Sequence, residues 1–220
     1  MIGVLNLTFL DYSIIVLISI VLIVGAYQFY FWCQRQFVRP RKRLLTFFDS
    51  WFGYHPSWIW IYGGLYYLFI IFAVLTIKDM HQFVYIVFSY FILLALQMAF
   101  FLLFPVESPL GWRKLASGNT LSERFLRLVM KFDADSNCFP SMHVSVAMLT
   151  SFHILANQPE VGLWVFLFPA LIALSALYTK RHYFADIIPG VLLGWGVFEI
   201  YKIIYFWLNL LNIKTFISIK

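Results

Sequence analysis

Apolar residues form long runs in this 220-residue chain, and polar residues gather in the segments between them. A helix needs about 20 apolar residues to cross the hydrocarbon core of a bilayer, which is roughly 30 Å thick. Six runs reach or approach that length, namely 12–32, 58–77, 83–104, 143–156, 161–178 and 187–208. The pattern therefore predicts an all-α, polytopic membrane protein with six transmembrane helices, in which residues 1–220 form a single domain.

The fourth run is short and contains Ser145, Thr150, Ser151 and His153. Polar side chains are costly in contact with lipid, so this helix is expected to pack inside the bundle, with His153 as a satisfied core residue. The segment 157–160, Asn-Gln-Pro-Glu, has the composition of a turn. It predicts that the fourth and fifth spans form an antiparallel hairpin.

The composition agrees with a membrane protein, because 62% of the residues are hydrophobic and only 12% are charged. Tyr and Trp near the ends of the runs are typical of the interfacial aromatic belt. The basic residues lie in short segments between the runs and not on one soluble face, which argues against a nucleic-acid partner. Cys33 and Cys138 lack a CxxC spacing, so neither a zinc site nor a disulfide framework is supported.

Two polar clusters stand where an apolar run meets a loop: Phe-Pro-Ser-Met-His at 139–143 and Arg-His-Tyr-Phe-Ala-Asp at 181–186. The chain leaves one membrane face at His143, crosses, turns at Pro159 and crosses back to Arg181. Parity therefore predicts that both clusters lie on the same face.

The loops 34–56 and 105–139 are predicted on that face too. Within the second loop, Thr120 and Glu123 have the spacing of a capping box. Phe125, Leu128 and Phe132 follow at helical spacing. They predict an amphipathic helix at the membrane surface.

His182 and Asp186 are four residues apart, so on a helix they share one face. The carboxylate then accepts a hydrogen bond from the proton-bearing ring nitrogen of His182, and the other ring nitrogen is left to attack an electrophile. This makes His182 the candidate nucleophile. The alternative interpretation is an ordinary hydrogen bond at a helix end.

Pro140 and Ser141 precede His143 at the expected first turn of the fourth helix, where backbone N–H groups bind anions. A phosphate at this turn would lie beside His143, which could protonate a departing alkoxide and later take a proton from water. The alternative is a plain helix start with an interfacial histidine.

Four cations on this face are candidates for binding phosphate oxygens: Arg181, Lys180, Arg113 and Lys114. Their alternative role is to set membrane orientation or to contact lipid headgroups.

Phe-Pro-Ser-x-His at a helix start, followed two spans later by His-Tyr-x-x-Asp, resembles the type 2 phosphatidic acid phosphatase superfamily. The nearest likeness is the branch that includes inositol phosphorylceramide synthases. The resemblance covers residues 105–208, with the catalytic motifs within 105–190. It implies a phosphohistidine mechanism without metal or other cofactor, in which His182 attacks phosphorus, Asp186 supports it, His143 serves the leaving group and Ser141 helps to bind phosphate.

The chain departs from the family pattern at two positions. The family commonly has Arg six residues before the nucleophile, where this chain has Ala176. The family's first motif, a Lys followed seven residues later by Arg-Pro, is reduced to Pro109, and Phe101 stands in the Lys position. Arg113, Lys114, Lys180 or Arg181 would then supply the missing charge.

The leading functional hypothesis is a phosphatase that hydrolyses a lipid phosphomonoester or diphosphate, such as phosphatidic acid, phosphatidylglycerol phosphate or a polyprenyl diphosphate. The first alternative is a lipid phosphotransferase that passes a phospho-headgroup to an alcohol. A lower-ranked alternative is a metal-binding transporter with His143, His182 and Asp186 as ligands.

The partners expected are therefore a lipid phosphate and the bilayer, and a bacterial cell membrane is the expected location. The basic cluster from Arg35 to Arg43 and most other cations share the predicted catalytic face. By the positive-inside rule that face is cytoplasmic, whereas bacterial members of the resembled family have it in the periplasm.

Overall fold

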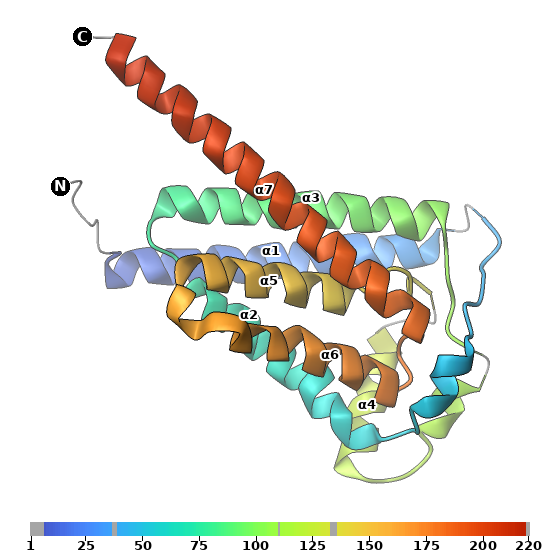
Figure 1. Ribbon diagram of the computed structural model, residues 1–220. Coiled ribbons are helices and arrows are strands. Elements are labelled where there is room, and N and C mark those ends of the chain that lie inside the picture. The colour runs from blue at the N-terminus through green and yellow to red at the C-terminus, as the bar shows by residue number, and fades with distance from the viewer. Residues whose placement is uncertain (1–6, 37–38, 110, 133–135, 219–220) are drawn as a thin grey trace.

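The computed structural model describes residues 7–36, 39–109, 111–132 and 136–218, with side chains described up to residue 208. Apart from one β-bridge between Lys42 and Val106, the regular structure of these residues is helical. Figure 1 shows α5 (Met142–Asn157) in the centre of a bundle, with α1 (Phe9–Arg35) and α3 (Met80–Leu103) along one side of it. The other helices are α2 (Tyr66–Val74), α4 (Leu121–Phe132), α6 (Leu167–Tyr178) and α7 (Phe184–Ser218).

Five described segments are long and apolar enough to cross a membrane: Phe9–Arg35, Pro56–Val74, Met80–Leu103, Pro159–Tyr178 and Phe184–Leu208. They confirm the predicted polytopic all-α membrane protein and correspond to five of the six predicted spans. The remaining predicted span is α5, which has 16 residues and is therefore about 24 Å long. It is shorter than the hydrocarbon core of a typical bilayer.

Helix α5 lies inside the bundle, as its polar residues predict. Ser145, Thr150 and Ser151 are fully buried, and His153 is 3% exposed. A helix with this many polar groups needs a partner that satisfies them, because each unpaired group in an apolar medium is costly.

That partner is mainly α3, which runs antiparallel to α5. Four side-chain pairs join the two helices along their length: Gln82 with Asn157 at 2.7 Å, Ser89 with His153 at 2.9 Å, Tyr90 with Thr150 at 2.7 Å, and Gln97 with Ser145 at 3.2 Å. Ser151 donates instead to the backbone of Val165, before α6. The prediction of a satisfied core histidine at His153 is confirmed.

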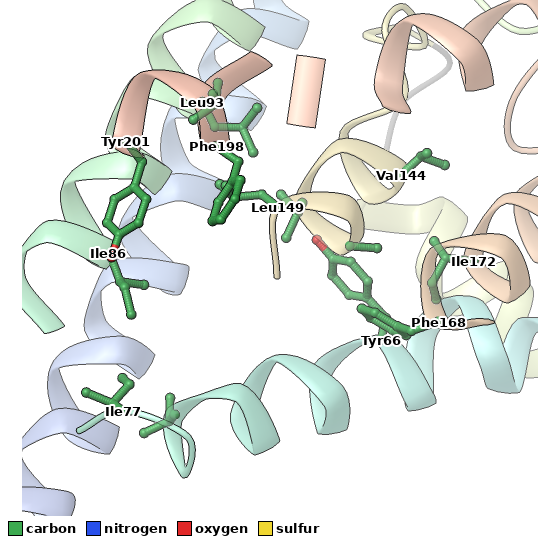
Figure 2. Close-up of a cluster of buried hydrophobic side chains, with 14 of the residues drawn as sticks. Tyr66, Ile77, Ile86, Leu93, Val144, Leu149, Phe168, Ile172, Phe198 and Tyr201 are labelled. Carbon is green, nitrogen blue, oxygen red and sulfur yellow. The ribbon is translucent and has the colours of Figure 1, made fainter. Parts of the chain in front are cut away.

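Apolar residues from the surrounding helices close over α5. Figure 2 shows Val144 and Leu149 of α5 among Tyr66 of α2, Phe168 of α6 and Phe198 of α7. Phe152 of α5 stacks on Phe198, with ring centroids 5.0 Å apart. This packing fixes the direction in which α5 presents its first turn.

Helices α5 and α7 approach each other most closely at two glycines of α7. A Cβ atom at Gly190 would lie 2.9 Å from the backbone oxygen of Ser141, and one at Gly194 would lie 2.5 Å from that of Ser145. Small residues four apart allow this backbone contact in membrane helices. The contact draws the first turn of α7 toward the first turn of α5.

The amphipathic helix predicted after Thr120 is α4. The Thr120 side chain accepts from the backbone N–H of Glu123, and the Glu123 carboxylate accepts from the backbone and hydroxyl of Thr120. Leu126 and Met130 pack inward, whereas Leu128 and Phe132 are exposed. The exposed apolar side chains are those expected of a helix at the membrane surface.

The Gly194→Ala variant is expected to unfold at lower temperature in detergent, because its methyl group would overlap the Ser145 carbonyl and overpacking of this kind costs about 1–3 kcal/mol. The matched control is Gly196→Ala on the same helix, where an added Cβ meets no atom within 4 Å. Equal melting temperatures for the two variants would contradict the close approach of α5 and α7.

Candidate active site

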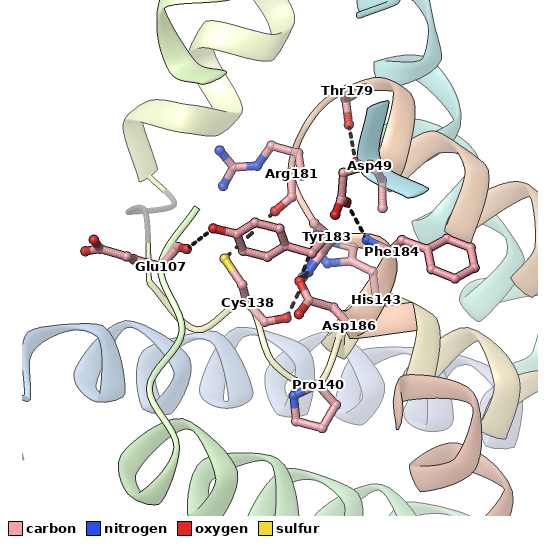
Figure 3. A network of polar contacts seen from close by, with 12 residues as sticks. Asp49, Glu107, Cys138, Pro140, His143, Thr179, Arg181, Tyr183, Phe184 and Asp186 are labelled. Carbon is pink, nitrogen blue, oxygen red and sulfur yellow. Dashed lines mark hydrogen bonds and ion pairs between the residues drawn. The ribbon is translucent and has the colours of Figure 1, made fainter. Parts of the chain in front are cut away.

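The two polar clusters meet at one end of the bundle. His143 stands in the first turn of α5, and His182 stands in the turn between α6 and α7. Their ring centroids are 6.3 Å apart. Figure 3 shows His143 and Asp186 close together in this region. The prediction that both clusters share one face is confirmed.

The ring of His182 is held by two acceptors on the same nitrogen. Its Nδ1 lies 2.9 Å from the backbone oxygen of Cys138 and 3.3 Å from Oδ2 of Asp186. A carbonyl oxygen only accepts, so Nδ1 carries the ring proton and Nε2 has a lone pair. The predicted His182–Asp186 contact is confirmed, and the Cys138 carbonyl is a partner that sequence reasoning missed.

Asp186 is fully buried and joins the two clusters. Its Oδ2 also accepts from the backbone N–H of Tyr183 at 2.9 Å, while its backbone oxygen accepts from the N–H of Ser141 at 3.1 Å. Within the part of the chain that the structure describes, its Oδ1 has no hydrogen-bond partner. One residue therefore orients His182 and also anchors the start of α5.

Two tyrosines of the second span contact the His143 ring and fix its orientation. The Tyr62 hydroxyl lies 3.0 Å from Nδ1 of His143, and the two rings stack with centroids 4.1 Å apart. Tyr66 packs against the same imidazole at 4.8 Å. When Tyr62 donates to Nδ1, the proton of the neutral ring resides on Nε2.

Ser141 is the residue that begins α5, and it is fully buried. Its Oγ makes no hydrogen bond to any described residue. The preceding residue, Pro140, is held by α3, because its carbonyl accepts from Nε2 of Gln97 at 2.5 Å. A fixed helix N-terminus with a buried hydroxyl suits an anion.

The turn that presents His182 is built on the end of α6. The backbone N–H groups of Arg181 and His182 both donate to the carbonyl of Ala176, at 2.9 and 3.4 Å. Lys180 turns the chain with a φ of 59°, in the left-handed region.

Asp49, in the basic loop before α2, holds this turn in place through hydrogen bonds. Its carboxylate accepts from the N–H of Phe184 at 2.8 Å (Figure 3). Its backbone oxygen accepts from Nζ of Lys180 at 3.0 Å. Burial lowers the pKa of the Lys180 ammonium, and the nearby Asp49 carboxylate opposes that shift. No local pattern indicates that Asp49 reaches Lys180 and Phe184, because these residues lie 131 and 135 positions further along the chain.

The four candidate cations lie in different environments. Arg181, directly before His182, is buried, and only 6% of the residue is exposed. The Lys180 ammonium lies over the Trp112 ring at 4.9 Å in addition to its bond with Asp49. Arg113 donates to the carbonyl of Met130, and Lys114 is exposed.

Among the described residues, no group of three His, Cys, Asp or Glu side chains has the arrangement of metal ligands. The thiols of Cys33 and Cys138 are both buried. The geometry brings His143, His182, Asp186 and Ser141 together at one end of the bundle.

These features define a class of protein, a helical membrane protein with two facing histidines at one end of its bundle. A family model described as the PAP2 superfamily matches residues 43–200, which is more than half of the chain. The chain belongs to the PAP2 superfamily, as its two motifs predict. No curated protein and no solved structure matches it. Membership supports phosphatase or related phosphoester chemistry on a lipid in a membrane.

The Asp49→Ala variant is expected to lose about 1–3 kcal/mol of stability, because the partly buried N–H of Phe184 and the backbone N–H of Thr46 would both lose their acceptor. Thermal unfolding in detergent measures this loss. Ser50→Ala is the control, because Ser50 is next to Asp49 in the chain but is exposed and bonds only locally to Phe47. Identical melting curves for the two variants would show that Asp49 does not hold the turn.

Proposed function

We propose that this protein is a lipid phosphatase that hydrolyses a phosphomonoester or diphosphate through a phosphohistidine on His182. The observation that supports this most directly is the pair of imidazoles 6.3 Å apart, each fixed through its Nδ1. A phosphoryl group bound at this end of the bundle would be within reach of both rings. Attack from one side and departure on the other are what in-line phosphoryl transfer requires.

In the first step, Nε2 of His182 attacks phosphorus and an N–P bond forms. The P–O bond to the lipid breaks, and its electron pair leaves with the lipid oxygen. His143 enters this step as the imidazolium, with its Nδ1–H donating to the Tyr62 hydroxyl. Its Nε2 gives a proton to the lipid oxygen, so the lipid departs as an alcohol and the ring is left neutral. The Asp186 carboxylate and the Cys138 carbonyl stabilise the positive charge that develops on the His182 ring.

In the second step, His143 takes a proton from water as the water oxygen attacks phosphorus. The N–P bond breaks, and its electron pair returns to Nε2 of His182. Inorganic phosphate leaves, and both rings recover their starting protonation states. His143 thus acts first as a general acid and then as a general base.

Phosphate binding falls to the start of α5 and to nearby cations. The buried Ser141 hydroxyl and the backbone N–H groups of the first turn are donors suited to the non-bridging oxygens. Arg181 is the first candidate for the charge missing at Ala176, because it is buried and adjacent to His182. Lys180, Arg113 and Lys114 are further candidates on the same face.

Release of inorganic phosphate separates this function from its alternative. Purified protein in detergent, given a lipid phosphate and no added alcohol, is expected to release phosphate. A phosphotransferase would release it only slowly and would instead form a new phosphoester when an alcohol is supplied.

The His182→Ala variant is expected to lose turnover completely while it still inserts and folds, because it removes the attacking nitrogen. Asp186→Asn is expected to lower turnover by up to about 10⁴-fold, the loss that the same change causes in the Ser-His-Asp arrangement. Phosphate release is the measurement. His81→Ala is the control, because His81 is exposed at the start of α3. Wild-type turnover in His182→Ala would refute the nucleophile assignment.

The His143→Ala variant is expected to be most impaired on substrates with poor leaving groups. General acid catalysis contributes about 10²- to 10⁴-fold, and an activated aryl phosphate needs little of it. Turnover of an alkyl phosphate and of p-nitrophenyl phosphate is compared in the variant and the wild type. An equal loss on both esters would contradict the acid role of His143.

A further inference from the structure

An apolar cavity of about 170 Å³ adjoins the candidate active site. It lies between α1, α2, α3 and α5, and His143 forms part of its wall. The same imidazole therefore borders both the cavity and the end of the bundle where the phosphoryl group would react.

The cavity is long and narrow. Along α5 its wall runs from Met142 and His143 to His153 and Asn157. Fourteen residues separate His143 from Asn157, which corresponds to a length of about 21 Å on a helix. A volume of this size over that length is too narrow for two hydrocarbon chains side by side, and it falls below the several hundred Å³ typical of drug-sized ligand pockets.

The wall offers little to a polar ligand. Most of its side chains are aliphatic or aromatic, and several of its polar groups bind one another. Tyr27 bonds to Tyr67, Tyr90 bonds to Thr150 at 2.7 Å, and His153 bonds to Ser89 at 2.9 Å. An occupant therefore gains from burial of apolar surface and not from new hydrogen bonds.

We propose that this cavity binds the hydrocarbon chain of the substrate, extended along α5, with the phosphate end between His143 and His182. The inference rests on the proposed function and narrows its substrate class to lipid phosphates with a single long chain. Chains that reach the far end bury more methylene groups and bind more tightly.

Two alanines in the cavity wall allow a test of chain length. Ala26 of α1 lies one turn before Tyr30, whose carbonyl accepts from Asn137 at the catalytic end. Ala73 of α2 lies near the far end, three residues before Thr76, which bonds to Asn157. Ala170 of α6 is exposed and outside the cavity, so Ala170→Trp is the matched control.

The substrates are hexadecyl phosphate, octyl phosphate and p-nitrophenyl phosphate. Ala73→Trp is expected to lower kcat/KM for hexadecyl phosphate by at least about tenfold, the loss that corresponds to two unburied methylene groups, and to spare octyl phosphate. Ala26→Trp is expected to impair both alkyl phosphates. Neither variant is expected to change turnover of p-nitrophenyl phosphate, and Ala170→Trp is expected to resemble the wild type on all three.

Unchanged hexadecyl phosphate turnover in both variants, or equal losses on all three esters, would overturn the proposal. Faster wild-type turnover of a diacyl phosphate than of hexadecyl phosphate would contradict the single chain.

A binding measurement separates this proposal from the proposed function. Hexadecyl phosphate with a photoreactive diazirine at the chain end is irradiated with the His182→Ala protein, and the labelled peptides are identified. Labels are expected near Ile77 and Phe83, at the far end of the cavity. Such labels without any phosphatase activity in the wild type would support binding of the hydrocarbon chain in the cavity and would refute the proposed phosphatase function. Labels confined to lipid-facing residues such as Leu17 would refute the cavity.

Discussion

The close approach of α5 and α7 is the constraint on which the site depends. Gly190 and Gly194 let the backbone of α7 lie against the carbonyls of Ser141 and Ser145. The N–H of Ser141 then reaches the backbone oxygen of Asp186. Through this bond the start of one helix and the start of another become one unit, and their histidines face each other. A side chain at either glycine would separate the two halves of the site.

The polar character of α5 is the second constraint, because its buried polar side chains need hydrogen-bond partners. Helix α3 supplies most of these partners. Four side-chain pairs spaced along both helices leave α5 with satisfied polar groups in an apolar bundle. The last of these residues, Gln97, also binds the Pro140 carbonyl and so fixes the start of α5. The same contacts that hold a short polar helix in the bundle therefore orient the turn that is proposed to bind phosphate.

Much of the fold could be predicted from the sequence, because its signals are local. Long apolar runs, the Thr120–Glu123 capping box and the four-residue spacing of His182 and Asp186 each report on structure within a few turns. Parity then placed both clusters on one face. The length of α5 was the weakest of these predictions, since polar residues shorten the apolar run and the helix is not long enough to count as a span by itself.

The parts of the site that were missed all depend on contacts between distant segments. Tyr62 and His143 are 81 residues apart, and Asp49 and Phe184 are 135 residues apart. The Cys138 carbonyl that fixes the His182 tautomer is a backbone atom, so no residue type could have indicated it. A tyrosine in an aromatic span or an aspartate in a basic loop has many ordinary roles, and only the packed structure selects among them.

The most direct test of the central claim is to trap the phosphoenzyme. The purified protein is mixed with a ³²P-labelled lipid phosphate, quenched in alkali within the first turnover and digested for peptide mapping. If His182 is the nucleophile, an acid-labile, alkali-stable phosphate is expected on the peptide that contains His182, and none in His182→Ala. Steady release of phosphate with no label on that peptide, or label on another residue, would contradict that assignment.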